Sequence, residues 1–73
     1  MTNEATKLKI LGQNIQKARK NKGFSQNMLA ENLDISREHL AKLETGKRRI
    51  SLKLLFLLAE VLKIDEAKLF NWK

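Results

Sequence analysis

Side chains that can bind an anion are grouped in the middle of this sequence. Arg37 and Lys42 lie close together, and the run of Lys47, Arg48 and Arg49 follows. An arginine or a lysine can neutralise a phosphate, and the fork of an arginine can also pair with two acceptor atoms on the edge of a guanine base. The first question is therefore whether this part of the chain binds a polyanion, and which elements would position it.

The charge balance of the whole sequence agrees with an anionic partner but does not establish one. The 73 residues include 15 Lys and Arg against 8 Asp and Glu, which gives a net charge of +7. Such a chain attracts polyanions and releases their counterions on binding. A lysine-rich surface that only keeps a small protein soluble is the alternative. The positions of the charges are therefore more informative than their number.

The sequence lacks the groups that most enzymes and metal sites need. It has no cysteine, and its one histidine, His39, cannot hold a metal ion alone. No paired carboxylates, no nucleophile beside a base and no phosphate-binding glycine loop can be identified, so we expect no enzyme. We also expect no cofactor and no small-molecule ligand. No apolar run approaches about 18 residues and the start of the chain is polar, so we expect a cytoplasmic protein that does not enter a membrane.

Apolar residues recur every three or four positions almost throughout the chain, which is the period of an α-helix. The pattern predicts an all-α fold with five helices, and Gly23, Asp34 and Gly46 mark the first three breaks. The residues expected to cap the later helices are Ser25, Ser36, Ser51 and Asp65. We expect one domain over residues 7–73 and a flexible tail over residues 1–6, which carry no apolar anchor.

The second and third expected helices are short, and a turn of a few residues separates them. In this geometry one helix can cross a DNA backbone while the next enters the major groove. If Leu40 and Leu43 face the core, a rotation of 100° per residue turns another set of side chains outward. That set, which would face the bases, is Arg37, Glu38, Ala41 and Lys42.

Each of these outward side chains matches a feature of a base edge. Arg37 can donate two hydrogen bonds to guanine, Glu38 can accept one from cytosine, and Ala41 leaves room for a thymine methyl group. Lys42 can reach a base or a phosphate. The alternative is that Arg37 and Glu38 are ordinary surface charges or pair with each other. Because phosphates repel a carboxylate, Glu38 would serve discrimination more than affinity.

A set of residues spaced between Leu11 and Leu62 is informative as a group. They are Leu11, Gly12, Ile15, Arg19, Gly23, Phe24, Ser25, Gln26, Leu29, Ala30, Leu33, Ile35, Ser36, Arg37, Leu40, Leu43, Glu44, Gly46, Lys47, Arg48, Ser51, Leu52, Leu55, Ala59 and Leu62. This set resembles the phage-repressor helix-turn-helix family, of the Cro, lambda-repressor and xenobiotic-response-element type. The resemblance runs from about Leu11 to Phe70. It implies a compact five-helix, lambda-repressor-like domain that binds DNA and regulates transcription, with its helix-turn-helix formed by the second and third helices.

The resemblance also implies roles for residues outside the third helix. Arg19 and Glu44 would form an ion pair that orients the third helix, and an exposed pair would contribute about 0 to 1 kcal/mol. Asp34 stands where the family usually has glycine, so we expect a left-handed backbone there. The residues expected to contact DNA phosphates are Ser25, Gln26, His39, Thr45, Lys47, Arg48 and Arg49. For Ser25 the alternative is that it only caps the second helix. For Lys47, Arg48 and Arg49 the alternative is that they only keep the protein soluble.

The fourth expected helix carries more apolar side chains than one core-facing stripe needs. The residues expected to face the core are Leu52, Leu55, Leu58, Ala59 and Leu62, and a second stripe of leucine and valine lies about 115° away. The residues that we expect in a homodimer interface, which would suit a palindromic operator, are Leu54, Leu57, Val61, Phe70 and Trp72. The alternative is that the last helix and Trp72 fold back and cover this stripe.

Two other functions remain compatible with the composition. A cationic amphipathic protein that acts on membranes would need positive charges along one face of the fourth helix, and the charges do not lie there. A protein-binding regulator of the same fold, such as an antitoxin, would carry the same motif and would purify with a stoichiometric partner. The motif and the basic run together favour DNA as the partner.

Overall fold

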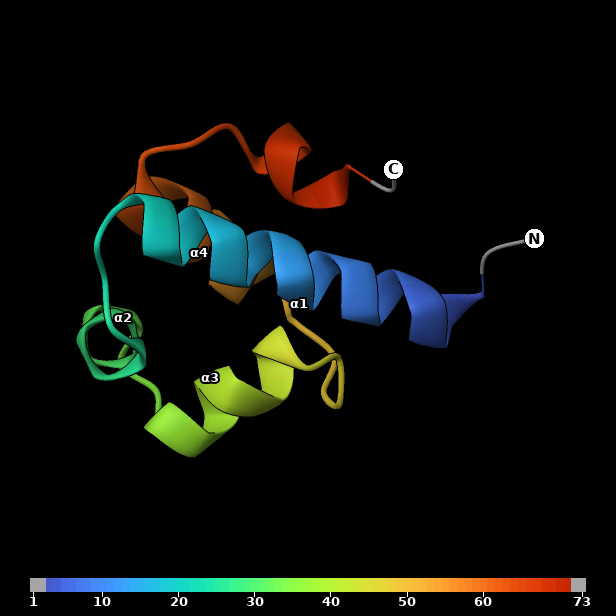
Figure 1. Cartoon of the computed structure of the whole chain (residues 1–73), viewed down its shortest axis with the longest axis horizontal. Helices are drawn as coiled ribbons and strands as arrows, with labels where there is room; N and C mark the ends of the chain where they lie inside the picture. Colours follow the sequence, from blue (N-terminus) through green and yellow to red (C-terminus); the bar gives the residue numbers. More distant parts are fainter. Residues whose placement is uncertain (1–2, 72–73) are drawn as a thin grey trace.

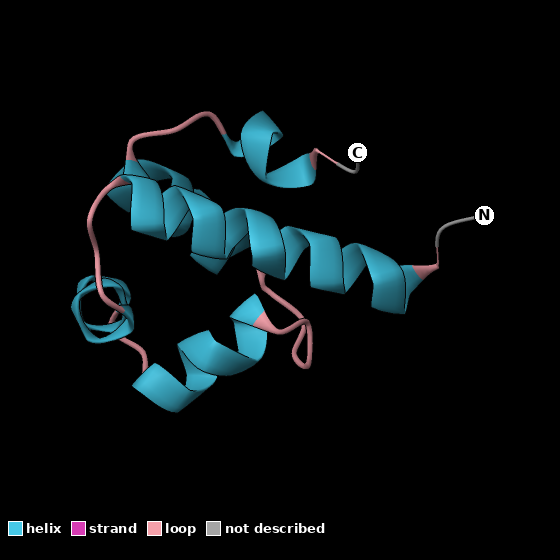
Figure 2. Ribbon diagram, in the orientation of Figure 1, coloured by secondary structure: helices cyan, strands magenta, loops and turns pink. Residues whose placement is uncertain are grey.

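The computed structural model describes residues 3–71, and every regular element in that range is a helix (Figures 1 and 2). The elements are α1 (Glu4–Asn21), α2 (Gln26–Leu33), α3 (Arg37–Glu44), α4 (Leu52–Leu62) and the 3₁₀ helix η1 (Glu66–Phe70). The predicted all-α class is therefore confirmed. The predicted five α-helices are corrected to four, because the last segment has only five residues and closes with a hydrogen bond from the Lys68 amide to the carbonyl three residues earlier.

Serine side chains begin three of the helices. The hydroxyl oxygens of Ser25, Ser36 and Ser51 accept hydrogen bonds of 3.0 to 3.1 Å from the backbone amides three residues further on. These bonds satisfy amides that have no partner within the first turn of a helix. The three predicted serine caps are confirmed.

The first helix begins earlier than the apolar pattern of the sequence predicts. The Asn3 side chain accepts a hydrogen bond of 2.9 Å from the Thr6 amide, and Glu4 places a negative charge in the first turn, where the helix dipole favours it. Residues 4–6, which were assigned to a flexible tail, are therefore helical. Their side chains are exposed, so the cap rather than packing stabilises this turn.

Two helices end at a left-handed residue that is not glycine. Asp34 closes α2 with a φ of 57°, as expected for the helix-turn-helix turn, and Lys63 closes α4 with a φ of 55°. Gly46 follows α3 with a φ of 75°, and a Cβ atom there would lie 2.7 Å from the Cα atom of Lys9. Glycine at this position therefore permits both the turn and its contact with α1.

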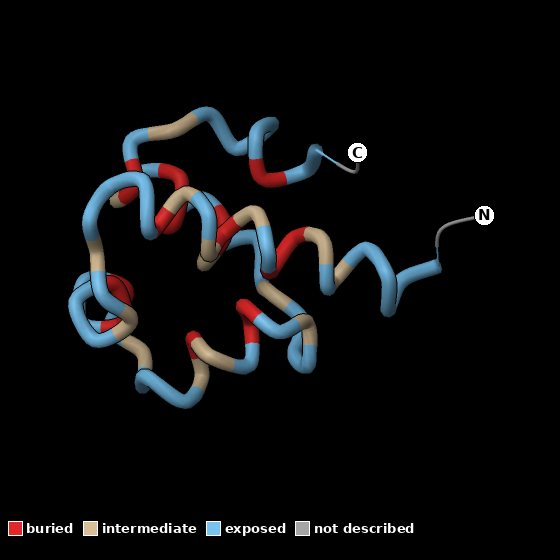
Figure 3. The backbone as a smooth tube through the Cα atoms, in the orientation of Figure 1, coloured by how far each residue is buried: buried red, intermediate tan, exposed pale blue. Residues whose placement is uncertain are grey.

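The core is formed by buried apolar residues from all five elements. In Figure 3 the buried segments of the helices are red and lie mostly on the inner sides of the fold. The largest side chains that are fully buried are Ile15, Leu29, Leu40, Leu58, Leu62 and Leu69. α1 crosses the whole molecule, with α3 on one side and η1 on the other (Figure 1). The outward face of α3 therefore remains exposed at one edge of the molecule.

One prediction about the core is wrong. Leu52 was expected to face the core, but it is 67% exposed, because it is the first residue of α4 and precedes the turns that pack against the rest of the protein. The other members of the expected stripe are buried, namely Leu55, Leu58, Ala59 and Leu62. The first turn of α4 therefore presents an apolar side chain to solvent.

Candidate nucleic-acid interface

The outer face of α3 carries the residues that were expected to read bases. Arg37, Glu38 and Lys42 are exposed and Ala41 is half-buried, while Leu40 and Leu43 on the opposite side are fully buried. Within residues 3–71, the side chains of Arg37, Glu38 and Lys42 form no ion pair or hydrogen bond with other residues. The expected alternative of an Arg37–Glu38 pair is therefore not formed, and both groups are available to a partner.

A buried ion pair positions the end of α3. The Arg19 Nε atom lies 2.7 Å from the Glu44 Oε2 atom, and a second guanidinium nitrogen donates to Oε1 at 3.2 Å. The two side chains are only 8% and 1% exposed, so the pair is not the exposed one considered from the sequence. The remaining guanidinium nitrogen donates to the Phe24 carbonyl oxygen at 2.8 Å. This pair therefore connects α1, the loop before α2 and α3.

Gln26 joins the same network. Its Nε2 atom donates a hydrogen bond of 3.0 Å to the Glu44 Oε1 atom. Because an amide nitrogen carries two hydrogens, the second one is available to another acceptor. Gln26, which the sequence predicts as a phosphate contact, therefore fixes the start of α2 against the end of α3.

A glycine in the middle of α1 permits the close approach of α3. A Cβ atom at Gly12 would lie 2.5 Å from the Glu44 carbonyl oxygen and would also collide with the Leu43 carbonyl oxygen. Any side chain there would push α3 away from α1. This role of Gly12 was not predicted, although a glycine within an apolar helical run is a signal of close helix packing.

The loop after α3 presents the basic run to solvent. Lys47, Arg48 and Arg49 are all exposed, and the first two make no ion pair within the described residues. Arg49 is different, because its guanidinium group lies 2.6 Å from a carboxylate oxygen of Glu4 at the start of α1. This pair is 79% and 60% exposed, so solvent screens it and a competing anion can replace the carboxylate.

The other residues expected at phosphates have different surroundings. The Ser25 oxygen accepts the amide hydrogen of Met28, which leaves its own hydroxyl hydrogen available. The Thr45 hydroxyl donates to the Ala41 carbonyl oxygen at 3.0 Å, so its hydrogen is already used within α3. His39 is half-buried beside the exposed face of α3.

The stripe expected at a homodimer interface is only partly exposed. Leu54, Leu57 and Val61 are half-buried and pack against the core. Phe70, at the end of η1, is 39% exposed, and Trp72 lies outside the described residues. The protein therefore covers part of this stripe but not all of it.

A second apolar flank of α4 was not anticipated. Leu52 and Phe56 are 67% and 54% exposed. At 100° per residue these two side chains lie within about 40° of each other, while Leu54, Leu57 and Val61 lie on the other side of the buried stripe. α4 thus has two flanks that could contact another molecule.

Residues 3–71 contain no membrane-spanning helix and no cluster of metal ligands. No helix in this range is long and apolar enough to span a membrane. No group of three or more His, Cys, Asp or Glu side chains in the same range could hold a metal ion. The exposed face of α3, with the basic loop beside it, is the feature that needs a functional explanation.

Two short helices, α2 and α3, are joined by a turn, and a buried ion pair holds α3 so that its outer face is exposed. This is the arrangement of a helix-turn-helix DNA-binding protein. The HTH_3 helix-turn-helix family model matches residues 15–69. The chain belongs to this family. None of the curated proteins gives a significant match.

Several solved structures of transcriptional regulators are similar to this chain. The restriction-modification controller protein C.AhdI from Aeromonas hydrophila has 35% sequence identity and a TM-score of 0.82, over 86% of this chain and 96% of that one. The clp gene regulator ClgR from Corynebacterium glutamicum has 28% identity and a TM-score of 0.83, over 88% and 68% of the two chains. The hypothetical transcription factor NHTF from Neisseria has 26% identity and a TM-score of 0.82, over 96% and 80%. Together with the family, these similarities identify a DNA-binding transcriptional regulator.

Proposed function

We propose that this regulator binds one specific duplex sequence, with α3 in the major groove, as a homodimer on a palindromic operator. The observation that carries the proposal is the outer face of α3, where Arg37, Glu38 and Lys42 are exposed and unpaired within the described residues. The buried contacts of Arg19 and Glu44 support it, because a helix that reads bases must be held in a fixed orientation.

The proposed base contacts follow from the hydrogen-bonding groups on α3. Arg37 donates two bonds to the O6 and N7 atoms of a guanine, and Glu38 accepts one from the amino group of a cytosine. Ala41 contacts the methyl group of a thymine, and Lys42 reaches the next base or its phosphate. Since Arg37 is the first residue of α3, its long side chain can enter the groove ahead of the helix.

The proposed phosphate contacts flank α3 on both sides. On one side Ser25 and Gln26 bind a phosphate with a free hydroxyl hydrogen and a free amide hydrogen. On the other side the basic loop binds the backbone, and Arg49 exchanges its exposed partner Glu4 for a phosphate. The full set that we propose is Ser25, Gln26, His39, Thr45, Lys47, Arg48 and Arg49. Of these, Thr45 requires its hydroxyl to rotate away from Ala41.

The homodimer is proposed on the half-buried stripe of α4. Leu54, Leu57 and Val61, joined by Phe70 and Trp72, would bury against the same residues of a second copy. A twofold axis there places two α3 helices about 34 Å apart, one turn of DNA, which matches a palindromic operator. A second copy also adds buried apolar area to a chain whose own core is small.

Two single substitutions separate base readout from phosphate binding. We expect Arg37→Ala to weaken binding to the preferred site by about 1 to 3 kcal/mol and to relax the preference at one base pair. Lys47→Ala should weaken binding to all duplexes alike. It should also reduce the slope of log affinity against log salt concentration by about one, because one phosphate contact is lost. Fluorescence anisotropy on the preferred and a scrambled duplex, over a range of salt concentrations, measures both effects. Equal losses on both duplexes for both variants would refute the assignment.

A further inference from the structure

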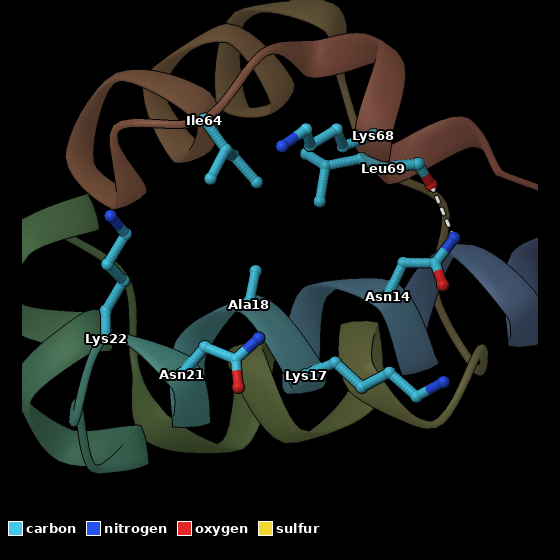
Figure 4. Close-up of a pocket in the computed structure, with 8 residues that line it drawn as sticks. All are labelled: Asn14, Lys17, Ala18, Asn21, Lys22, Ile64, Lys68 and Leu69. Atoms are coloured by element: carbon cyan, nitrogen blue, oxygen red, sulfur yellow. Dashed lines mark hydrogen bonds between the residues drawn. The ribbon is translucent and has the colours of Figure 1, made fainter.

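A cavity of about 390 Å³ lies between α1 and η1, away from the DNA-facing side (Figure 4). The α1 residues that line it include Asn14, Lys17, Ala18 and Asn21. At 100° per residue these four lie on the side of α1 opposite to Gly12 and Arg19, which contact α3. The cavity therefore has no part in the interface described above.

The wall of this cavity is fixed by contacts between distant parts of the chain. The Asn14 Nδ2 atom donates to the carbonyl oxygen of Leu69 at 2.9 Å and to that of Asn71 at 3.0 Å. These bonds use both amide hydrogens and hold η1 against α1. The Leu69 side chain, which is 1% exposed, anchors η1 to the core. A ligand would therefore meet a preformed site.

The lining combines an apolar floor with a cationic rim. Ala18 on α1 faces Ile64 and Leu69 across the cavity, while Lys22 and Lys68 stand on opposite walls (Figure 4). Lys17 also belongs to the lining, which includes no acidic residue. Within residues 3–71 none of the three ammonium groups forms an ion pair or hydrogen bond. The rim therefore carries positive charge without an ion-pair partner among the described residues.

We propose that this cavity binds a small organic anion that has an apolar body and a carboxylate or phosphate head. Its volume lies in the range of small-molecule sites, about 300 to 1,000 Å³, and its apolar floor suits an aliphatic or aromatic body. Lys22 and Lys68 bind the head from both sides, and the Asn21 amide supplies a further donor. At the end of α1 the carbonyl oxygens of Ala18, Arg19 and Lys20 already accept hydrogen bonds from the backbone amides of residues 22–24.

Binding of octanoate and octyl phosphate to the full chain, followed by NMR, tests this proposal. We expect saturable shifts of the Asn14 and Asn21 side-chain amides and of the methyl groups of Ala18, Ile64 and Leu69. The comparison between the two probes identifies the preferred head. Octanol and octylammonium, which have the same body without the negative charge, should bind at least about tenfold more weakly. Equal binding of octanol, or shifts that do not saturate, would overturn the proposal.

Matched lysine variants test the role of the cationic rim. Lys22→Gln combined with Lys68→Gln should weaken octanoate binding by about tenfold, whereas Lys20→Gln with Lys53→Gln, which remove the same charge outside the lining, should leave it unchanged. Equal losses in both pairs would show that only net charge matters and would overturn the site.

A variant that fills the cavity tests the role of the apolar floor. Ala18→Met places a larger side chain in the cavity and should abolish octanoate binding while helical content and DNA binding remain. If a tetraglutamate peptide, which has no apolar body, binds as tightly as octanoate, the lysines form a patch for an acidic macromolecule instead. That result would also overturn the proposal.

Discussion

Two arginine–carboxylate pairs in this protein have the same chemistry but opposite surroundings. Arg19 and Glu44 are almost completely buried, whereas Arg49 and Glu4 are mostly exposed. Solvent and the entropy of two long side chains reduce the contribution of an exposed pair to about 0 to 1 kcal/mol. Removing one partner of a buried pair is far more costly, because the other charge is left without a counter-charge or water.

Substitution of each carboxylate measures this difference. We expect Glu44→Ala to lower the free energy of unfolding by about 3 kcal/mol or more, and Glu4→Ala by less than about 1 kcal/mol, in urea denaturation. Replacing both buried partners, Arg19→Met with Glu44→Leu, should restore part of the loss, since no charge is then left buried. A loss below about 1 kcal/mol for Glu44→Ala would contradict the anchoring role of the pair.

At the residue scale, the sequence predicted on which side of a helix a residue lies better than it predicted contacts between residues far apart in the chain. The outward placement of Arg37, Glu38 and Lys42 followed from helical rotation alone. The bond from Gln26 to Glu44 and the pair between Arg49 and Glu4 did not, because these partners are 18 and 45 residues apart. Contacts over such separations depend on how the helices pack, which no local pattern encodes.

At the scale of the elements, local capping signals predicted most of the helix starts. Ser25, Ser36 and Ser51 each bond to an amide of the first turn, and such bonds depend on neighbouring residues only. Asn3 caps α1 in the same way, but the cap was not predicted, because the residues after it carry no apolar side chains at helical spacing. The exposure of Leu52 was missed for a different reason, since helical period alone does not show where the core ends.

The close contact between α1 and α3 leads to a prediction about glycine. We expect Gly12→Ala to lower the free energy of unfolding by about 1 to 3 kcal/mol, even though alanine favours helices, because its Cβ atom would collide with backbone atoms of α3. It should also weaken DNA binding, since α3 must shift. Thermal denaturation and anisotropy measure the two effects.

Gly23→Ala is the matched control for this prediction. The position has a φ of 76° and no neighbouring atom within 4 Å of an added Cβ, so the cost should come from backbone strain alone, at about 1 kcal/mol. DNA affinity should then stay close to that of the wild type. If Gly12→Ala is as stable as the wild type, the contact between α1 and α3 does not constrain the fold.

At the scale of the whole molecule, we expect substitutions on the two apolar flanks of α4 to affect self-association differently. Leu54→Lys with Leu57→Lys should leave most helical content intact and yield monomers that bind palindromic DNA weakly, because these residues form the proposed interface. Leu52→Lys with Phe56→Lys, on the other flank, should remain dimeric. Analytical ultracentrifugation on the order of tens of micromolar protein, with circular dichroism as the folding control, distinguishes the two pairs.

The outcomes that contradict the dimer proposal are equally specific. A wild-type protein that sediments as a monomer without DNA would show that no stable dimer forms in solution. If only Leu52→Lys with Phe56→Lys dissociates the dimer, the interface lies on the other flank of α4 and not on the proposed one.

Selection of bound sequences from a random duplex pool tests the central claim, that the exposed face of α3 reads a specific sequence. At moderate salt the wild type should enrich one palindromic sequence, and Arg37→Ala should enrich the same sequence with the preference lost at one base pair of each half-site. Enrichment of no sequence by the wild type would show that the exposed cations serve only general attraction to DNA, and would contradict the account.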